Sequence, residues 1–384
     1  MKRLHLFGFL LISLYIVGCN TNPKNKALEK APEDPRLNEI KLPDGFRIGL
    51  FAKDVDNARS LAVSDKGTVF VGNRKGNSVY ALVDANNDGY AEKKYVIASG
   101  MNMPNGVALH NGSLYIAEVD KIWRMDNIEA NLENPPKPVL VNDSFPSEKH
   151  HGWKYIAFGP DGKLYVPVGA PCNICDDSEK DKRFASITRM NPDGSGYEVF
   201  AHGVRNTVGF TWHPQTNELW FTDNGRDMLG DTLPGDELNR APQMNMHFGY
   251  PYCHQGMLKD SQFNKGKDCG QFVQPAARLE AHTAALGLKF YTGNMFPAQY
   301  HNQLFIAEHG SWNRTDPMGY RIMLVKLDGN NVKSYEPFAQ GWLKDGKAWG
   351  RPVDVLQMKD GSMLVSDDHA NAVYRITYER AMKK

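Results

Sequence analysis

A short sequence phrase recurs six times along the chain, and this repetition constrains the fold more than any other feature. Each copy begins with a turn residue and continues into an apolar run rich in β-branched and aromatic residues, as is typical of a buried strand. The copies lie at residues 67–71, 112–116, 162–166, 217–221, 302–306 and 361–365. Strand-only units recurring every roughly 40 to 50 residues indicate a β-propeller, in which blades pack against their neighbours. We therefore predict an all-β, six-bladed propeller.

The segments around the six copies define the expected blade cores. These cores are 61–84, 107–125, 156–194, 207–241, 285–328 and 352–378. Outer strands are expected between them, for example at 46–51 and 95–98. Because the last core ends near Tyr378, we expect a strand at 45–51 to close the ring against the final blade. An insert at about 242–284 separates the fourth and fifth cores, and long loops in compact domains usually carry function.

The composition fits one large domain. The 384 residues are 41% hydrophobic, which allows a sizeable core, and radial repetition lets a single domain exceed the usual size. The formal net charge is +1, and no run of lysines and arginines is long enough to follow a phosphate backbone. Nucleic acid is therefore not an expected partner.

The N-terminus has the pattern of a lipoprotein export signal. Lys2 and Arg3 precede an apolar run at 4–17, too short to span a bilayer, which is followed by Gly18 and Cys19. We expect residues 1–19 to be the signal and Cys19 to be lipidated, with an uncleaved anchor as the alternative. Asn20 resembles the outer-membrane sorting pattern of proteobacterial lipoproteins, so a periplasmic, outer-membrane-anchored protein is expected. Residues 20–39 have no apolar period and are expected to form a flexible tether before a propeller at 40–384.

Four further cysteines would meet an oxidising compartment after export. Cys172, Cys175, Cys253 and Cys269 permit three pairings, and pairing of nearest neighbours is favoured because each pair lies within one loop. A zinc site of four thiolates is the alternative. Asp176 follows Cys175, so the segment is not the Cys-x-x-Cys-His pattern of covalent haem attachment.

Polar residues follow the repeated phrases, at strand ends that should meet around the central channel. They lie at 73–75, 117–118, 169–172, 222–227, 307–310 and 366–369. Loops on a rigid scaffold commonly carry function. The mixture of acids, bases and amides suits a polar cofactor or a cation better than an apolar ligand.

Two short motifs outside those loops could carry catalysis. His150-His151 precedes the third core, and a histidine can act as a general base near neutral pH because its ordinary pKa is about 6.5. Arg205-Asn206 opens the fourth blade, where a cation and an amide could hold a carboxylate or a developing alkoxide, or bridge two blades.

Other motifs suggest ions. The segment 223–227, followed by Asp236-Glu237, offers hard oxygen ligands around a glycine turn, as calcium prefers, although such clusters also form simple turns. The segment 84–89 resembles the first half of a calcium loop, but Tyr95 at its twelfth position excludes an EF-hand. Arg314 and Arg351 add cations to the same face, and several arginines around one cleft indicate a ligand with multiple carboxylates or phosphates.

Together these motifs make the chain resemble the soluble quinoprotein sugar dehydrogenases that use pyrroloquinoline quinone (PQQ), in the sorbosone dehydrogenase or aldose sugar dehydrogenase branch. The resemblance covers about residues 40–380. It rests on the order and blade placement of His151 before 159–162, the segments 171–175, 203–206, 223–227, 236–239, 309–314 and 350–354, and Ser366-Asp367-Asp368.

The resemblance implies a tricarboxylated quinone held at the channel mouth by arginines and calcium. By position, His151 would take the proton from the anomeric hydroxyl of an aldose while hydride passes to the quinone, and Arg205 would stabilise charge developing on the quinone oxygen. The remaining implied residues are the backbone carbonyls of Gly225 and Arg226 for calcium, and Asn105, Asn206, Arg314, Arg351 and Asp367 for the cofactor. Electrons would pass to an external acceptor, a cytochrome or a quinone.

The chain departs from glucose-oxidising relatives, since Val353 stands where they carry a basic residue and the segment 310–314 replaces their lysine-bearing loop. This favours the sorbosone-like branch and leaves the carboxylate partners open. His150 and His151 remain alternative bases. Two other functions remain open: a calcium-dependent sugar lactonase of propeller fold, and a non-catalytic surface lipoprotein that binds glycans or proteins. The sequence does not identify the sugar, the acceptor or the oligomeric state.

Overall fold

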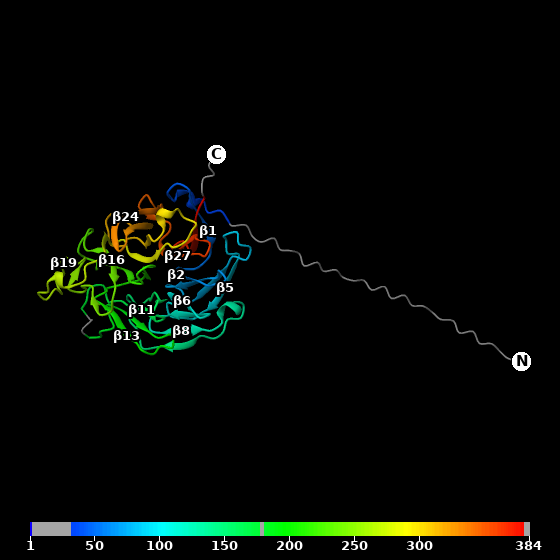
Figure 1. The fold of residues 1–384 in the computed structure, drawn as a ribbon, viewed down its shortest axis with the longest axis horizontal. Coiled ribbons are helices and arrows are strands. Elements are labelled where there is room, and N and C mark those ends of the chain that lie inside the picture. The colour runs from blue at the N-terminus through cyan, green and yellow to red at the C-terminus, as the bar shows by residue number, and fades with distance from the viewer. Residues whose placement is uncertain (2–31, 177–179, 380–384) are drawn as a thin grey trace.

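The computed structural model describes Met1 and residues 32–176 and 180–379. In these residues the strands form six blades arranged around a common axis (Figure 1). The chain passes around the disc from the blue β2 through the cyan β8 and the green β13 to the orange β24. The predicted all-β, six-bladed propeller is confirmed.

Each blade contains four antiparallel strands, and the sheet of blade 3 has a fifth, parallel strand at its edge. Blade 1 contains β2 (Ala58–Val63), β3 (Val69–Asn73), β4 (Val79–Val83) and β5 (Lys93–Ala98). Blade 2 contains β6 (Gly106–His110), β7 (Ser113–Ala117), β8 (Ile122–Met125) and β9 (Val139–Asn142). Blade 3 contains β10 (Ala157–Phe158), β11 (Leu164–Val168), β12 (Ser186–Met190) and β13 (Glu198–His202). Blade 4 contains β14 (Phe210–Trp212), β15 (Leu219–Asp223), β16 (Gly235–Ala241) and β20 (Ala277–Ala281). Blade 5 contains β21 (Ala285–Phe290), β22 (Leu304–Glu308), β23 (Arg321–Asp328) and β24 (Asn331–Gln340). Blade 6 contains β27 (Pro352–Gln357), β28 (Met363–Asp367), β29 (Ala372–Tyr378) and β1 (Phe46–Ala52).

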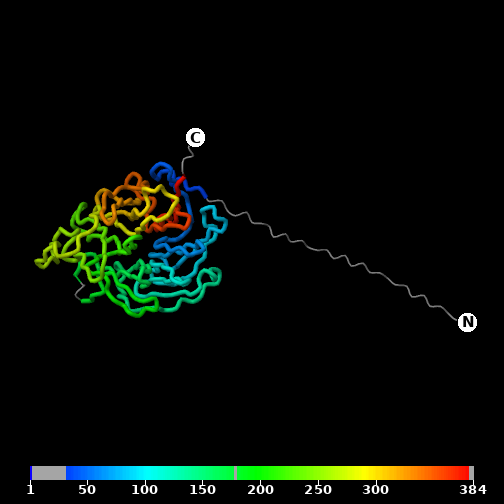
Figure 2. Tube along the Cα trace, viewed as in Figure 1, coloured from blue at the N-terminus to red at the C-terminus, as the bar shows by residue number. Residues whose placement is uncertain are grey.

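The first strand of the chain closes the ring. β1 pairs antiparallel with β29, with Phe46 opposite Tyr378, so the last blade is completed by a segment from the other end of the sequence. In Figure 2 the blue and red parts of the tube lie side by side at this point. The predicted closure is confirmed, and the pairing removes an edge strand that would otherwise be free to pair with another chain.

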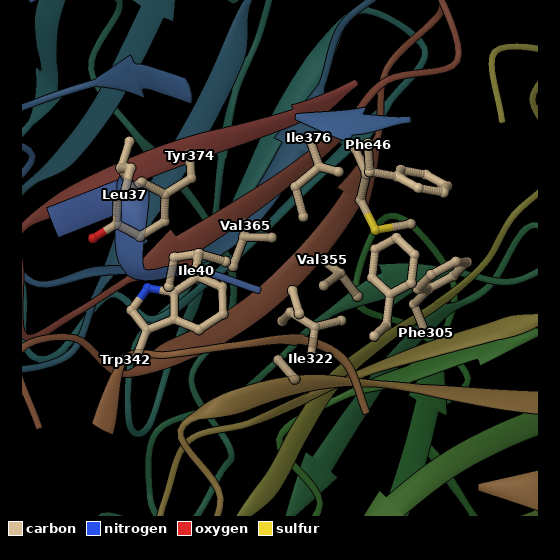
Figure 3. Packing of buried hydrophobic residues seen from close by; sticks show 14 of the residues in the cluster. Leu37, Ile40, Phe46, Phe305, Ile322, Trp342, Val355, Val365, Tyr374 and Ile376 are labelled. Carbon is tan, nitrogen blue, oxygen red and sulfur yellow. The ribbon is translucent and has the colours of Figure 1, made fainter. Parts of the chain in front are cut away.

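The six repeated phrases form the second strands of the blades, namely β3, β7, β11, β15, β22 and β28. All of their residues are buried except Ser113 at the start of β7, because each second strand lies inside its sheet and is covered by the neighbouring blades. Figure 3 shows one such packing region, where Phe46 and Phe305 lie close to Val355 and Ile322. Full burial of side chains of this size contributes about 1.5–3 kcal/mol each.

The folded unit begins before residue 40, so the predicted tether at 20–39 is too long at its C-terminal end. Pro35–Glu39 forms the short 3-10 helix η1, and Leu37 is buried in the same packing region as Trp342 and Tyr374 (Figure 3). Burial of this apolar side chain holds the segment on the propeller. The predicted signal at 1–19, the lipidation site Cys19 and the tether up to residue 31 lie outside the described residues. Within the described part of the chain, no helix is long and apolar enough to cross a membrane.

The insert at about 242–284 contains more regular structure than a loop. Its β17 (Met246–His247) runs parallel to β13 of blade 3, and its β20 completes blade 4. Between them lie the hairpin of β18 (Cys253–His254) and β19 (Leu258–Lys259) and the helix η3 (Cys269–Gln271). The remaining short elements of the fold are η2 (Ile128–Ala130), η4 (Ala298–Tyr300), β25 (Leu343–Lys344) and β26 (Lys347–Ala348).

Two disulfides join the four cysteines as nearest neighbours, Cys172 with Cys175 and Cys253 with Cys269. The predicted pairing is confirmed. Because all four sulfur atoms are used in these bonds, they do not form the alternative zinc site.

Candidate active site

A cavity of about 660 Å³ lies where loops from all around the ring converge. Its walls include Arg74 after β3, Asn173 after β11, Asn224 after β15 and His309 after β22. The predicted convergence of the second-strand ends therefore holds for these blades. Blades 2 and 6 differ. Glu118 after β7 accepts hydrogen bonds from the Asn102 amide and the Trp123 indole and does not line the cavity, and neither do residues 366–369 after β28.

The second set of cavity residues comes from segments that lead into the first strand of each blade. These segments carry His150, His151 and Trp153 before blade 3, Arg205 and Asn206 before blade 4, and Arg351 before blade 6. First strands start, and second strands end, at the same face of a propeller because the two run antiparallel. This topology places residues far apart in the sequence in one pocket.

His151 has the geometry of a general base. Its side chain is buried at the cavity wall, and its Nδ1 lies 2.9 Å from the carbonyl oxygen of Ala170. Because a carbonyl oxygen only accepts, Nδ1 carries the hydrogen and Nε2 is left free to take a proton. Burial, followed by the positive charge of Arg205, lowers the pKa of His151 well below its usual range. The ring is therefore neutral at pH 7.

The backbone around His151 is shaped for this placement. His151 adopts a φ of 51°, in the left-handed region that is uncommon for a non-glycine residue and often found at functional sites. A Cβ atom on Gly169 would lie 2.6 Å from the Cβ of His151, so only glycine fits at that position. His150 also lines the cavity but is exposed, and its ring lies 4.1 Å from that of His151.

Arg205 is held in the cavity by oxygen atoms that carry no formal charge. Its Nη1 donates to the carbonyls of Asn224 (3.1 Å) and Gly225 (2.9 Å), and its Nη2 donates to the side-chain Oδ1 of Asn173 (2.6 Å). The backbone amides of Arg205 and Asn206 both donate to the buried carboxyl of Asp223. The Arg205 side chain is buried, and this burial lowers its pKa. No carboxylate contacts the guanidinium directly, so its positive charge is not neutralised by a neighbour.

Two more guanidinium groups face the cavity without a carboxylate in direct contact. Arg351 donates to the carbonyls of His309 and Gly310. The guanidinium of Arg74 lies 3.7 Å from the centre of the Trp153 ring and has no hydrogen bond or ion pair to any residue in 32–176 and 180–379. Burial, followed by repulsion from Arg59, lowers the pKa of Arg74 to about 10. The cavity is therefore prepared for an anion with several negative groups.

A fourth arginine is neutralised in place. Arg59 is 1% exposed, donates from Nη1 to Asp368 (2.9 Å) and from Nε to Asn105 (3.0 Å). His309 lies 2.8 Å from the other oxygen of Asp368. Burial opposes the ionisation of Asp368, but His309 and Arg59 outweigh it and keep its pKa below the usual range. Burial also lowers the pKa of His309 to about 4, so its ring is neutral.

The acidic wall lies around Gly225, Asp227 and Asp236, all of which line the cavity. Asp227 faces His282, whose pKa is raised by this contact, and Asp236 accepts from the Gly225 amide and the Thr283 hydroxyl. The Gly225 carbonyl can bind a cation because it has a second lone pair beside its bond to Arg205. Gly225 with the neighbouring carboxylates fits a calcium ion, whereas Arg226 lies outside the cavity lining, with its guanidinium bound to Asp260.

Of the remaining residues predicted to bind the cofactor, some line the cavity and others do not. Asn206 lines the cavity. Asn105 and Asp367 are completely buried behind it: Asn105 holds Arg59, and Asp367 accepts from the backbone amides of Arg351, His369 and Ala370. Arg314 lies outside the lining and donates to the carbonyls of Ala281 and Asp316, because its loop turns toward blade 4. The three arginines predicted to share one pocket are therefore reduced to Arg205 and Arg351.

The sequence analysis missed Arg59 as a site residue, and it placed Arg74 among the residues 73–75 expected at the channel without assigning it to the cofactor. Arg74 directly follows the second strand of blade 1, so its position gave a usable signal. Arg59 lies at the start of the first strand of blade 1, and Arg205 and Arg351 lie just before the first strands of blades 4 and 6. This shared position could have identified Arg59 from the sequence. The segment 84–89 remains a predicted ion site: oxygens of Asp84, Asp88 and Glu92 lie within 4.8 Å of one another.

Comparison with known proteins now places the chain. A sequence model described as TrAA12-like matches residues 40–379, which is most of the protein. The chain belongs to the TrAA12-like family. An uncharacterised protein of Borreliella burgdorferi is 35% identical over 365 residues, covering 89% of this chain and 91% of that relative.

Relatives with a described activity are more distant. The PQQ-dependent pyranose dehydrogenase of Coprinopsis cinerea is 24% identical over 419 residues, covering 90% of this chain and 55% of that protein, so the chain spans about half its length. The holo form of its PQQ domain matches with a TM-score of 0.73 and 19% identity, covering 88% of this chain and 97% of the domain. The fold is thus shared, and the predicted relationship to PQQ-dependent sugar dehydrogenases is confirmed.

Proposed function

We propose that this protein is a quinoprotein that oxidises the anomeric carbon of an aldose or of a sorbosone-like sugar aldehyde, with PQQ and calcium. The observation that carries the proposal is the cavity itself, where a neutral, oriented imidazole faces guanidinium groups that have no carboxylate in direct contact. Relationship to PQQ-dependent sugar dehydrogenases supports the choice of cofactor and substrate class.

The cavity fits PQQ in size and in chemistry. A volume of about 660 Å³ is in the range of small-molecule sites, and the cofactor's three carboxylates need cationic partners. Arg74 and Arg351 would supply them, with Asn206 as an amide donor at the same wall. When bound, PQQ supplies a two-electron acceptor that no side chain provides.

The chain's own residues would handle the proton and the charge. His151 Nε2 would accept the proton of the anomeric hydroxyl, and the Ala170 carbonyl would stabilise the resulting imidazolium through Nδ1. Arg205 would hold positive charge beside the reacting oxygens, already oriented by its three carbonyl and amide partners. Because His150 is exposed and no hydrogen bond fixes its tautomer among the described residues, we assign the base to His151.

Calcium would bind at the Gly225 carbonyl on the acidic wall, with Asp227 supplying negative charge, and Arg226 could contribute only through its backbone. A sugar lactonase would instead need a cage of carboxylates on the metal. Here Asp236 is already used by a backbone amide and by Thr283, and arginines surround the pocket, so the geometry favours the oxidoreductase. We further propose export as a lipoprotein through Cys19 and transfer of electrons to an external cytochrome or quinone.

A cofactor titration followed by a sugar panel tests the proposal. Purified protein incubated with calcium and PQQ should reduce an artificial dye when aldoses are added, and EDTA treatment should abolish the activity until calcium is returned. A protein that neither binds PQQ nor reduces the dye with any sugar overturns the proposal. Hydrolysis of a sugar lactone without PQQ would favour the lactonase, and ligand binding without turnover would favour the non-catalytic lipoprotein.

A further inference from the structure

The loop between β11 and β12 supplies the partner that orients Arg205 from the side of blade 3. The Asn173 backbone carbonyl accepts from Arg205 Nε (3.4 Å) and Nη2 (3.1 Å), and its side-chain Oδ1 accepts from Nη2 (2.6 Å). The carbonyls of Asn224 and Gly225 bind the guanidinium from blade 4. Because the guanidinium is planar with donors in fixed directions, acceptors from two blades define its plane.

Asn173 also connects the two blades directly. Its Oδ1 accepts from the backbone amide of Asp227 (3.2 Å), so one side-chain oxygen bridges the Arg205 guanidinium and the loop that carries Gly225. If Asn173 lay in a flexible loop, making these contacts would cost conformational entropy, and this cost would reduce the net stability of the contacts.

The Cys172–Cys175 disulfide removes much of that freedom in advance. The two cysteines are three positions apart and flank Asn173 and Ile174, so the bond closes a small ring that contains the Arg205 partner. The hydroxyl of Tyr250, from the insert, donates to the Cys175 carbonyl (2.7 Å) and fixes the ring on its other side. A ring this short restricts the unfolded chain less than the Cys253–Cys269 bond, which spans 16 positions, so its main effect is local.

We propose that Asn173 is a positioning residue for Arg205 and that the Cys172–Cys175 ring holds Asn173 in place for this task. The proposal rests on the proposed function for the role of Arg205 toward the cofactor, while the coupling between ring and arginine is a property of the protein alone. The neutral oxygens of Asn173 orient the guanidinium and leave its charge available for an anion.

The test uses the full chain without cofactor and then with PQQ. The variants are Cys172→Ser/Cys175→Ser, Asn173→Ala and Arg205→Ala, with Cys253→Ser/Cys269→Ser as the matched disulfide control. Hydrogen exchange of peptides covering 223–228 reports the Asp227 amide, and quenching of tryptophan fluorescence reports PQQ affinity. Removing the short ring or the Asn173 side chain should speed that exchange and weaken PQQ binding about tenfold, the effect of one lost hydrogen bond to a charged group.

The disulfide control, and the short-ring variant combined with Arg205→Ala, test whether the ring acts through Arg205. Loss of the Cys253–Cys269 bond should lower the Tm more than loss of the short ring and change PQQ affinity less than twofold, a change near the noise of ordinary surface substitutions. In the Arg205→Ala background, loss of the short ring should have no further effect on affinity. Unchanged exchange at 223–228, or effects on affinity that add to those of Arg205→Ala, overturn the proposal. If the wild-type protein does not bind PQQ, the proposed function fails, and the exchange measurement still decides the coupling.

Discussion

The two sides of the cavity use the same kinds of residue differently. On the base side, formed by blades 3 and 4, His151 and Arg205 are held by carbonyl and amide oxygens. On the anchor side, formed by blades 5, 6 and 1, Arg59 is paired with Asp368, whose other oxygen lies against His309, while Arg351 and Arg74 have no carboxylate in direct contact.

The two sides therefore differ in whether a positive charge is available to a ligand or is already neutralised within the fold. Neutral acceptors orient a cation without neutralising it, so the base side keeps groups that can respond to a proton or to developing charge. An ion pair buried with its partners holds the fold, and breaking it leaves a charge without compensation. We therefore expect substitution of His151 on the base side to affect turnover, and substitution of Arg205 or its partners also to weaken cofactor binding. Substitutions on the anchor side should affect either stability or cofactor binding.

The largest effect is expected from breaking the buried pair on the anchor side. Asp368→Ala leaves the Arg59 guanidinium 1% exposed and without a carboxylate, which should lower the free energy of unfolding by about 3–5 kcal/mol. Asp126→Ala is the matched control, since its pair with Arg124 is on the surface and should contribute less than about 1 kcal/mol. Chemical denaturation measures both changes in the free energy of unfolding. Equal losses would show that the buried Asp368 pair contributes no more than a surface ion pair.

Removal of the base should give the largest effect on turnover. His151→Ala should lower kcat at least about a hundredfold, equivalent to about 2.7 kcal/mol of barrier, with PQQ affinity nearly unchanged. His150→Ala, in the neighbouring exposed residue, should keep kcat within about threefold, as expected of a residue outside the proton transfer. Steady-state kinetics on the PQQ-loaded enzyme would contradict the assignment if the two variants exchanged these effects.

The unpaired arginine on the anchor side should affect binding without affecting the fold. Arg74→Ala removes a half-buried cation whose guanidinium has no hydrogen-bonded partner among the described residues, so the Tm should stay constant or rise. PQQ binding should weaken by about 10- to 30-fold, as for loss of a charge-assisted contact. Arg47→Ala, on the exposed face of β1, is the control for nonspecific charge effects. Unchanged affinity in a calorimetric titration would remove Arg74 from the site.

A smaller effect on the base side is expected from the glycine that His151 packs against. Gly169→Ala would place a Cβ 2.6 Å from the His151 Cβ and so move the imidazole, lowering kcat by about five- to tenfold because general-base catalysis depends on position. Gly49→Ala is the control, since its Cβ would meet open space. If both variants had the same kcat, the position of His151 would not depend on Gly169.

The pH profile gives the subtlest test. A general base must be neutral, and burial with the nearby Arg205 charge lowers the His151 pKa well below its usual range. As pH falls, kcat/KM should therefore stay level through pH 6.5 and decline only at lower pH. In Arg205→Gln, loss of the cation should move this acid limb to higher pH, whatever the variant does to the maximal rate. An acid limb that does not move would show that Arg205 does not act on His151.

Much of the fold was predictable because blade repetition leaves a local pattern. A second strand is covered on both faces, so it must be apolar until the polar residues at its end, and the six phrases record that requirement without reference to any other part of the chain. Leu37 carried no such period, and its burial in the cluster that contains Trp342 and Tyr374 is visible only in the folded propeller.

For the site, the order of residues specifies which groups are supplied: the imidazole of His151, the guanidinium of Arg205 and the turn at Gly225. Which groups act together depends on how the blades pack around the axis. This packing turned Arg314 toward the Ala281 carbonyl, placed Arg74 over Trp153 and paired Arg59 with Asp368, more than 300 positions away. An arginine in this pocket keeps its charge available to a ligand only if no carboxylate from another blade lies within hydrogen-bond distance. The packing of the blades around the closed ring determines whether such a carboxylate is present.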